Sequence, residues 1–224
     1  MPDILIIGAS RGIGLGLAQE FVGRGWTVTA TVRDAGKADA LRGLGKVGLE
    51  TVDIADAASS AGLAERLGGK TFDAVVINAG VSGPQASPKG VDHDAFADLF
   101  VTNSLAPVRI AEMLVKLVKP QTGAIGFMTS QLGSVANNTG GGMELYRASK
   151  AALNSFTRSF SARHRDKGLS ILSLHPGWVK TDMGGPGADI DVATSVKGLA
   201  DVVEKALGAH QEAYLDYAGN ELPW

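Results

Sequence analysis

The sequence lacks cysteine altogether, and its 224 residues contain no long apolar run. Without cysteine, disulfide bonds, thiolate metal sites and a cysteine nucleophile are excluded, and a reducing compartment is favoured. A membrane span needs about 18 consecutive apolar residues, and the start at Met1-Pro2-Asp3 has neither the basic nor the apolar part of a signal peptide. We therefore expect a cytoplasmic protein with no membrane partner.

An excess of charge of either sign is also missing. The chain has 21 Lys and Arg against 23 Asp and Glu, which gives a formal net charge of −2. Proteins that bind nucleic acid usually carry a concentrated basic surface, so we expect small molecules and not nucleic acid as partners. The four histidines show no metal-ligand spacing, and no metal is predicted. His175 is interpreted as a packed residue at a strand end.

The length and the hydrophobic pattern predict one domain over residues 1–224. Short apolar runs, expected to be strands, lie at 4–7, 26–32, 47–52, 72–77, 123–129, 169–174 and 213–217. Helical patterns lie between them, at 13–21, 57–67, 92–119, 143–165 and 192–207, with a short helical or irregular piece at 37–44. This alternation predicts an α/β fold: a Rossmann-type, doubly wound parallel sheet of about seven strands with helices on both faces. We interpret 81–91 as a loop and 183–191 as a substrate lid.

A glycine-rich turn, Gly8-Ala-Ser-Arg-Gly12-Ile-Gly14, follows the first strand and leads into a helix. Glycines there let backbone N–H groups approach a phosphate at the start of the helix, because no Cβ is in the way. The position of the turn, directly after a buried strand at the start of the chain, favours dinucleotide binding.

The end of the second strand predicts which dinucleotide binds. Rossmann-type domains that bind NAD have a carboxylate at this position, which accepts hydrogen bonds from the ribose hydroxyls. This chain has Val32 there, followed by Arg33. Arg33, joined from the other side by Arg11 of the glycine turn, would bind a 2′-phosphate, so NADP(H) is preferred over NAD(H). In the alternative interpretation both arginines are solvated and Asp34 binds the ribose.

Tyr146 and Lys150 lie four residues apart on an expected helix, and therefore on one face. A nearby ammonium favours the tyrosinate, so we expect Lys150 to lower the pKa of Tyr146 from about 10. Ser130 comes at the end of the fifth strand, the edge at which ligands bind in open α/β sheets. Within the helical pattern at 92–119, Asn103 and Pro107 are unusual, which indicates either a kink at Pro107 or a break that lets Asn103 hold a water or a lysine.

These motifs, in this order, make the chain resemble the short-chain dehydrogenase/reductase family from end to end. The glycine turn matches the family's Gly-x-x-x-Gly-x-Gly pattern, although Ile7 replaces its usual preceding Thr. The family's Asn-Asn-Ala-Gly motif appears at 77–80 with Ile77 in place of the first Asn. The end of the chain and the segment 175–185 resemble more narrowly the small carbonyl reductases of the sniffer and C-factor-like type.

The resemblance implies a catalytic tetrad of Asn103, Ser130, Tyr146 and Lys150. It implies, together with the arginines above, cofactor binding by Gly8, Ser10, Arg11, Gly12, Ile13, Gly14, Arg33, Asp53, Ile54, Asn78, Ala79, Gly80, Tyr146, Lys150, Pro176, Gly177, Val179 and Thr181. Ser134 lies slightly nearer to Tyr146 than the family's usual spacing and Ser130 lies farther away. We favour Ser130, which ends the strand in the family's Thr-Ser step, and interpret Ser134 as a turn residue.

The implied function is transfer of a hydride between NADP(H) and a carbonyl or alcohol of a small molecule, with Tyr146 as general acid and base. The implied assembly is a homodimer, through the helices at 92–119 and 143–165. The alternative is a catalytically minor, nucleotide-binding regulatory or signalling protein on the same fold, since a fold does not fix a function.

Overall fold

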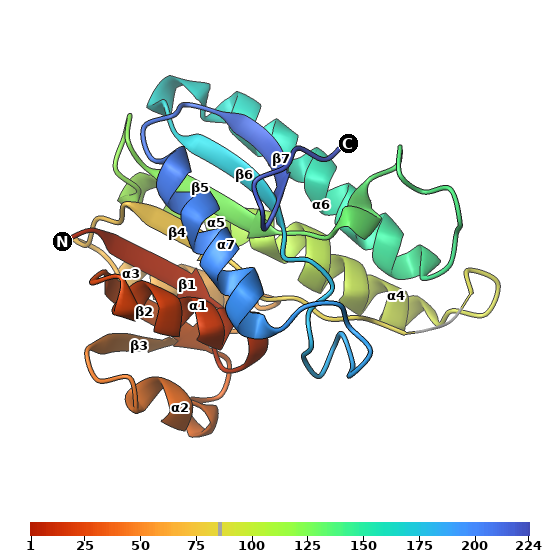
Figure 1. Cartoon of the computed structure of the whole chain (residues 1–224), viewed down its shortest axis with the longest axis horizontal. Helices are drawn as coiled ribbons and strands as arrows, with labels where there is room; N and C mark the ends of the chain where they lie inside the picture. The colour runs from red at the N-terminus through yellow and green to blue at the C-terminus, as the bar shows by residue number, and fades with distance from the viewer. Residues whose placement is uncertain (85–86) are drawn as a thin grey trace.

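The structure, a computed structural model, describes residues 1–84 and 87–224. In these residues seven strands form one parallel sheet in the order β3-β2-β1-β4-β5-β6-β7. They are β1 (Asp3–Ile7), β2 (Thr27–Val32), β3 (Val47–Thr51), β4 (Ala74–Ile77), β5 (Ala124–Met128), β6 (Ser170–His175) and β7 (Glu212–Asp216). Figure 1 shows β3 at one edge of the sheet and β7 at the other. The predicted doubly wound fold is confirmed. Residues 85 and 86 of the predicted loop at 81–91 lie outside the described residues.

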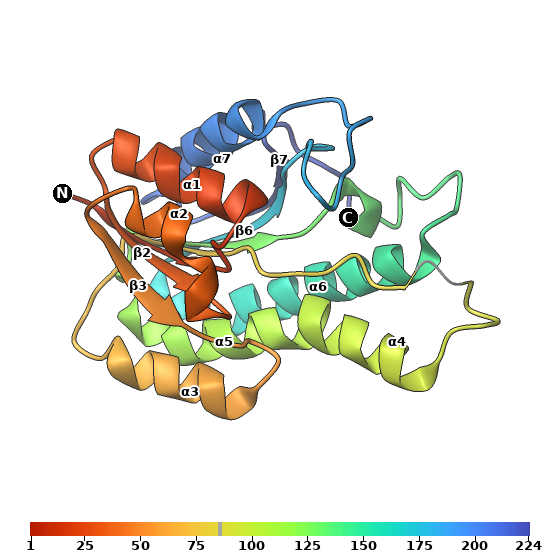
Figure 2. The ribbon, with the colours of Figure 1, turned by 90° about the horizontal axis from the view of Figure 1, so that it is seen from below.

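Helices cover both faces of the sheet (Figure 2). One face carries α1 (Gly12–Gly23), the short α2 (Asp39–Arg42) and α7 (Val192–Ala206). The other carries α3 (Ala57–Arg66), α4 (His93–Phe100), α5 (Ala106–Leu114) and α6 (Glu144–Arg163). No helix in the described part of the chain is long and apolar enough to cross a bilayer.

Burial on both faces explains why β1 is a continuous apolar run. Ile4 and Ile6 belong to the core beneath α1 and α7, whereas Leu5 and Ile7 belong to the core beneath α3, α5 and α6. Successive side chains of a strand point to opposite faces, so a central strand with helices on both sides needs apolar residues at every position. All four side chains are fully buried.

The helical pattern at 92–119 is interrupted at Asn103, which agrees with one of the two interpretations of the sequence. The chain forms α4, one π-helical turn (Val101–Leu105), α5 and a final 3-10 turn (Val115–Leu117). Pro107 has no N–H, so the carbonyl of Asn103, four residues earlier, cannot receive the usual helical hydrogen bond. The N–H of Ala106 bonds the Val101 carbonyl, five residues back, which marks the wider turn. The break therefore centres on Asn103, four residues before the proline.

Other boundaries differ by a few residues. The helix expected at 143–165 is α6, which begins at Glu144 after Met143 in a left-handed conformation, and a separate 3-10 turn (Arg165–Lys167) follows it. The piece expected at 37–44 is a 3-10 turn (Ala35–Lys37) followed by α2.

Candidate functional site

A cleft of about 1460 Å³ lies along the edge of the sheet at which the strands end. Its walls come from the loops after β1, β2, β3, β4 and β6 and from α4 and α6. Most of the predicted cofactor residues line it: Gly8, Ser10, Arg11, Gly12, Ile13, Arg33, Asp53, Ile54, Asn78, Ala79, Gly80, Tyr146, Lys150, Pro176 and Thr181. Residues far apart in the sequence are thus brought to one elongated site.

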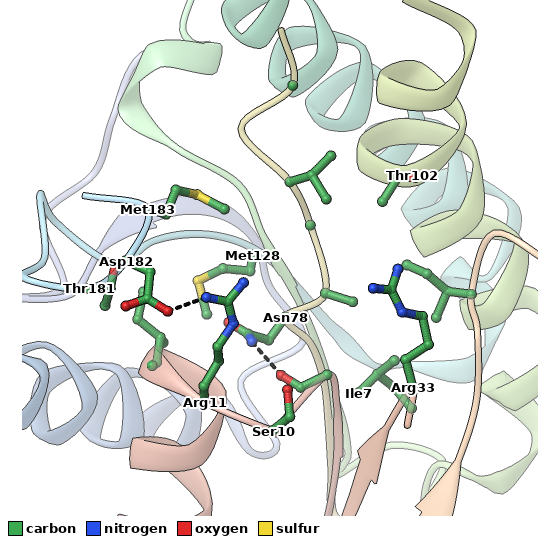
Figure 3. A pocket seen from close by; sticks show the side chains of 18 of the residues that line it. Ile7, Ser10, Arg11, Arg33, Asn78, Thr102, Met128, Thr181, Asp182 and Met183 are labelled. Atoms are coloured by element: carbon green, nitrogen blue, oxygen red, sulfur yellow. Dashed lines mark hydrogen bonds and ion pairs between the residues drawn. The ribbon is translucent and has the colours of Figure 1, made fainter. Parts of the chain in front are cut away.

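The glycine turn holds the loop after β1 tightly against the end of β4. Gly8 has a φ of +88°, and a Cβ at this position would lie 2.8 Å from the Cβ of Ala79. A Cβ on Gly14 would overlap the Gly8 carbonyl oxygen and lie 2.6 Å from Nδ2 of Asn78. That amide donates a 2.7 Å hydrogen bond to the same carbonyl (Figure 3). Gly14 does not line the cleft, so its part in the turn is close packing.

The first turn of α1 is suited to a phosphate group. Arg11 occupies the N-cap position, no described side chain caps the helix, and its first turn has no acidic residue. The first N–H groups of a helix have no partner within it and carry a partial positive charge. These groups adjoin the cleft at Gly12 and Ile13, so the turn fits the pyrophosphate of a dinucleotide.

The two arginines expected at the 2′ position do not come together. Arg33 lines one end of the cleft, whereas the guanidinium of Arg11 is paired with the carboxylate of Asp182, in the loop after β6 (Figure 3). Both partners of that pair are mostly exposed, so the interaction is weak. Lys37, which sequence reasoning missed, lines the same cleft as Arg33. The carboxylate of Asp34 accepts the Gly36 N–H at 2.9 Å and starts a 3-10 turn, which opposes its assignment to the ribose.

Tyr146 and Lys150 lie one turn apart on α6, as predicted, and both line the cleft. The Lys150 ammonium lies 5.8 Å from the centre of the Tyr146 ring and donates a 2.9 Å hydrogen bond to the Met128 carbonyl. Lys150 is 4% exposed, and burial lowers its pKa to about 8.

The expected effect of Lys150 on Tyr146 is wrong for this structure. Burial raises the pKa of Tyr146 to about 12, and the opposing influence comes from the nearby Ser130 side chain. The ammonium faces the ring and the Met128 carbonyl, and burial disfavours its charged form. Tyr146 is therefore a phenol, able to donate a proton.

Ser130 and Ser134 have different surroundings. The Ser130 hydroxyl lies near enough to Tyr146 to influence its pKa, and it accepts the Leu132 N–H at 3.2 Å, at the start of a 3-10 turn (Gln131–Gly133). The Ser134 hydroxyl accepts the Asn137 N–H at 3.1 Å and lies outside the cleft. These contacts favour Ser130 as the partner of Tyr146 and Ser134 as a turn residue.

Asn103 is fully buried behind the cleft. Its Oδ1 accepts the Val81 N–H and its Nδ2 donates to the Val81 carbonyl, both at 2.8 Å, and Nδ2 also donates to the Ser149 hydroxyl at 3.1 Å. A Cβ on Gly80 would lie 3.3 Å from Oδ1 of Asn103 and 3.4 Å from Nζ of Lys150. The side chain of Asn103 thus fixes the segment after β4, beside Lys150.

Several predicted residues support the cleft without lining it: Gly14, Asn103, Ser130, Gly177 and Val179. Sequence reasoning missed lining residues that include Lys37, Met128, Thr129 and Asp182, whereas Met183, which also lines the cleft, belongs to the predicted lid. Met128 and Thr129 end β5 directly before Ser130, so the rule that places sites at strand ends could have found them. Nothing local marks Asp182 as the partner of Arg11.

The amino-acid sequence from residue 3 to residue 189 matches the family model for short chain dehydrogenases. The chain belongs to the short-chain dehydrogenase/reductase family. In this family, C-signal of Myxococcus xanthus is 42% identical over 153 residues, which cover 68% of this chain and 92% of that protein.

Solved structures of short-chain dehydrogenases/reductases show the same fold over the whole chain. A family member from Burkholderia multivorans with bound NADP is 43% identical, with a TM-score of 0.96 over 100% of this chain and 99% of that one. The carbonyl reductase Sniffer of D. melanogaster is 31% identical, with a TM-score of 0.93 over 100% of both chains. The narrower resemblance drawn from the sequence, to sniffer and C-factor-like proteins, is thereby confirmed.

Proposed function

We propose that this short-chain dehydrogenase/reductase is an NADP(H)-dependent carbonyl reductase. It would transfer a hydride between the nicotinamide and a carbonyl or alcohol of a small molecule, with Tyr146 as general acid and base. The observation that carries the proposal is the Tyr146 phenol, placed beside buried Lys150 and near Ser130, in the same cleft as the glycine turn. The NADP bound by the Burkholderia multivorans relative supports the choice of cofactor.

The cofactor, when bound, supplies the hydride. Tyr146 would give its phenolic proton to the substrate oxygen as negative charge develops there. Ser130 would donate a hydrogen bond to that oxygen and so stabilise the same charge. The Gly8–Gly14 turn would hold the pyrophosphate, and Pro176, Gly177 and Thr181 would hold the nicotinamide end.

Lys150 and Asn103 would return the proton to Tyr146. With a pKa of about 8, Lys150 can both give and take a proton near neutral pH. We propose that the Asn103 carbonyl, deprived of its helical partner by Pro107, holds a water that connects Lys150 to solvent. Lys150 would also hydrogen-bond the nicotinamide ribose, and the segment 183–191 would act as the substrate lid.

Replacement of Tyr146 by Phe tests the proposal. The variant should bind NADPH as the wild type does but lose turnover of a reactive aldehyde or dicarbonyl by about 100-fold or more, because only the proton donor is removed. Tyr217→Phe, a tyrosine outside the cleft, is the matched control and should keep full activity. NADPH oxidation followed by absorbance measures the effect. Near wild-type turnover in Tyr146→Phe would refute the role of the tyrosine.

The two serines can be distinguished in the same assay. Ser130→Ala should lower kcat strongly, because the hydrogen bond to the substrate oxygen is lost. Ser134→Ala should keep its activity, because its hydroxyl serves the turn at Asn137. The reverse result would transfer the assignment to Ser134.

The preference for NADPH over NADH rests on Arg33. An exposed charge-assisted contact to a phosphate contributes roughly 1.5 kcal/mol, so Arg33→Ala should weaken NADPH binding about tenfold and leave NADH binding nearly unchanged. Arg165→Ala, which removes an arginine remote from the cleft, is the control. The dissociation constants of both cofactors decide the point, and equal affinities of the wild type would contradict it.

We also propose a homodimer through the face formed by α4 and α6, which lie on the same side of the sheet (Figure 2). Phe96 in α4, Leu105 in the π-helical turn that follows it and Phe156 in α6 are 40%, 46% and 43% exposed, which is unusual for side chains so apolar. Light scattering should give twice the chain mass of 23.1 kDa. A monomer at micromolar concentration would contradict the dimer.

A nucleotide-binding regulatory or signalling role is the second candidate, and the name of the relative C-signal is the observation that favours it. In that case the protein should bind NADPH but turn over none of a broad panel of carbonyls and alcohols. Turnover that depends on Tyr146 would exclude a role limited to nucleotide binding.

A further inference from the structure

Tyr214 lies in β7, the edge strand, yet its hydroxyl reaches the candidate active site. Its side chain is 2% exposed, and the hydroxyl donates a hydrogen bond to the backbone carbonyl of Ser130. A hydroxyl at this depth costs free energy unless it is hydrogen-bonded, and a phenylalanine would fill nearly the same space without that cost. The presence of tyrosine therefore points to the hydrogen bond.

Ser130 is held at both of its ends. Its carbonyl accepts hydrogen bonds from the Tyr214 hydroxyl and, at 2.8 Å, from the Gly133 N–H. Its side-chain hydroxyl lies near Tyr146 and accepts the Leu132 N–H. Because the carbonyl and the side chain belong to one residue, a tilt of the carbonyl also moves the hydroxyl relative to Tyr146.

The same helix that carries Tyr146 also supports Tyr214. Tyr146, Lys150 and Asn154 follow one another at intervals of four on α6, so they lie on one face. Asn154 is 4% exposed, its side chain lies near the Tyr214 hydroxyl, and its Nδ2 donates a 3.3 Å hydrogen bond to the Gly133 carbonyl. Helix α6 thus places Tyr146 near Ser130 and Asn154 near Tyr214.

The segment 221–224 holds the Tyr214 ring from the outside. The Trp224 ring lies 5.2 Å from the Tyr214 ring, centre to centre, and the Leu222 N–H donates to the Tyr214 carbonyl at 2.8 Å. The Trp224 carbonyl accepts the Ala136 N–H at 3.2 Å, and the Arg158 guanidinium lies 5.0 Å from the Trp224 ring. The segment thus contacts both Tyr214 and the loop that follows Ser130.

On the basis of the function proposed above, we propose that Tyr214 is a positioning residue for Ser130. Its hydroxyl fixes the Ser130 carbonyl, and thereby the direction of the Ser130 hydroxyl towards Tyr146 and the substrate oxygen. Asn154 and Trp224 hold Tyr214 in place. Tyr214 does not line the cleft, so its influence on turnover passes through Ser130.

The test compares Tyr214→Phe with Tyr217→Phe, which removes a hydroxyl for which no hydrogen bond is found among the described residues. In Tyr214→Phe, kcat should fall roughly threefold to tenfold, the factor that corresponds to one lost hydrogen bond, while KM for NADPH stays within about twofold. Hydrogen exchange should accelerate at the Leu132 and Gly133 amides, which bond to Ser130, with little change elsewhere. Tyr217→Phe should leave kcat and these two amides unchanged.

Two results would overturn the proposal. One is a Tyr214→Phe variant with the same kcat and the same exchange at Leu132 and Gly133 as Tyr217→Phe. The other is faster exchange across the whole sheet, which would show that the hydroxyl serves general stability. If the wild type reduces no carbonyl, the proposed function fails on its own, and the exchange rates at the two amides still decide whether Tyr214 positions Ser130.

Discussion

Replacement of Gly14 by Ala should damage both stability and cofactor binding. A Cβ at this position would overlap the Gly8 carbonyl oxygen and lie 2.6 Å from Nδ2 of Asn78 and 2.9 Å from Cα of Ala9. Two of these neighbours are backbone atoms, which cannot rotate away as the end of a side chain can. Gly23→Ala in the same helix is the matched control, because a Cβ there would have no atom within 4 Å.

The size of the effect follows from this geometry. Overpacking of a well-packed site costs about 1–3 kcal/mol, and overlap with a backbone carbonyl places Gly14→Ala at the upper end. For a domain of this size such a loss lowers Tm by roughly 6–12 °C. Gly23→Ala should instead raise the stability by up to about 1 kcal/mol, because alanine is the better helix former.

Urea unfolding and NADPH titration test both parts. Gly14→Ala must also shift the Asn78 amide, whose hydrogen bond fixes the loop after β1, so NADPH should bind more weakly even where the protein is fully folded. Gly23→Ala should bind NADPH as the wild type does. Free energies of unfolding that agree within about 1 kcal/mol between the two variants would refute the packing role assigned to Gly14.

Two further predictions concern buried ionisable groups. Lys150→Met should lose turnover yet be at least as stable as the wild type at pH 7, because burial lowers the pKa of Lys150 from 10.5 to about 8 and makes its charge costly there. In urea unfolding, the stability difference between Lys150→Met and the wild type should shrink as the pH rises from 8 to 10.5. A variant that is less stable than the wild type at both pH 8 and pH 10.5 would contradict this prediction. Burial likewise lowers the pKa of His175 from 6.5 to about 4. The free energy of unfolding of the wild type should therefore fall by on the order of 3 kcal/mol as the pH drops from 6.5 to 4, because only the unfolded chain takes up the proton. His175→Gln should reduce this loss, and an equal pH dependence of unfolding in the two proteins would count against a buried neutral histidine.

The parts of the fold that depend on local pattern could be predicted from the sequence. Ile4 to Ile7 alternate between the two cores, and an unbroken apolar run is the sequence pattern of that burial. The helical repeat alone predicts that Tyr146 and Lys150 lie on the same face of a helix. The strand before Gly8 and the helix after Gly12 are enough to predict that these glycines form a phosphate-binding turn.

The parts that depend on distant segments could not be predicted. The order of the strands is set by pairings such as Ile7 with Ile77, which no local pattern shows. The sequence places Arg11 beside the 2′-phosphate, but no local pattern shows that the carboxylate of Asp182, 171 residues away, pairs with it instead. The pKa of Tyr146 depends on burial by the whole cleft, and the spacing to Lys150 carries no information on burial. Nothing in the local sequence marks Tyr214, because its hydroxyl meets Ser130 only after β7 joins the sheet.

The central position of β1 also determines when the cleft can form during folding. β1 pairs on one side with β2, which follows closely, and on the other with β4, about 70 residues later in the chain. A nascent chain that ends before residue 77 therefore exposes one unpaired edge of β1, flanked by apolar side chains, and such edges promote aggregation. Pairing over long sequence separations is also slow. The hydrogen bond between Asn78 and Gly8 closes the glycine turn in the same step, so assembly of the sheet and formation of the phosphate site should be one kinetic event.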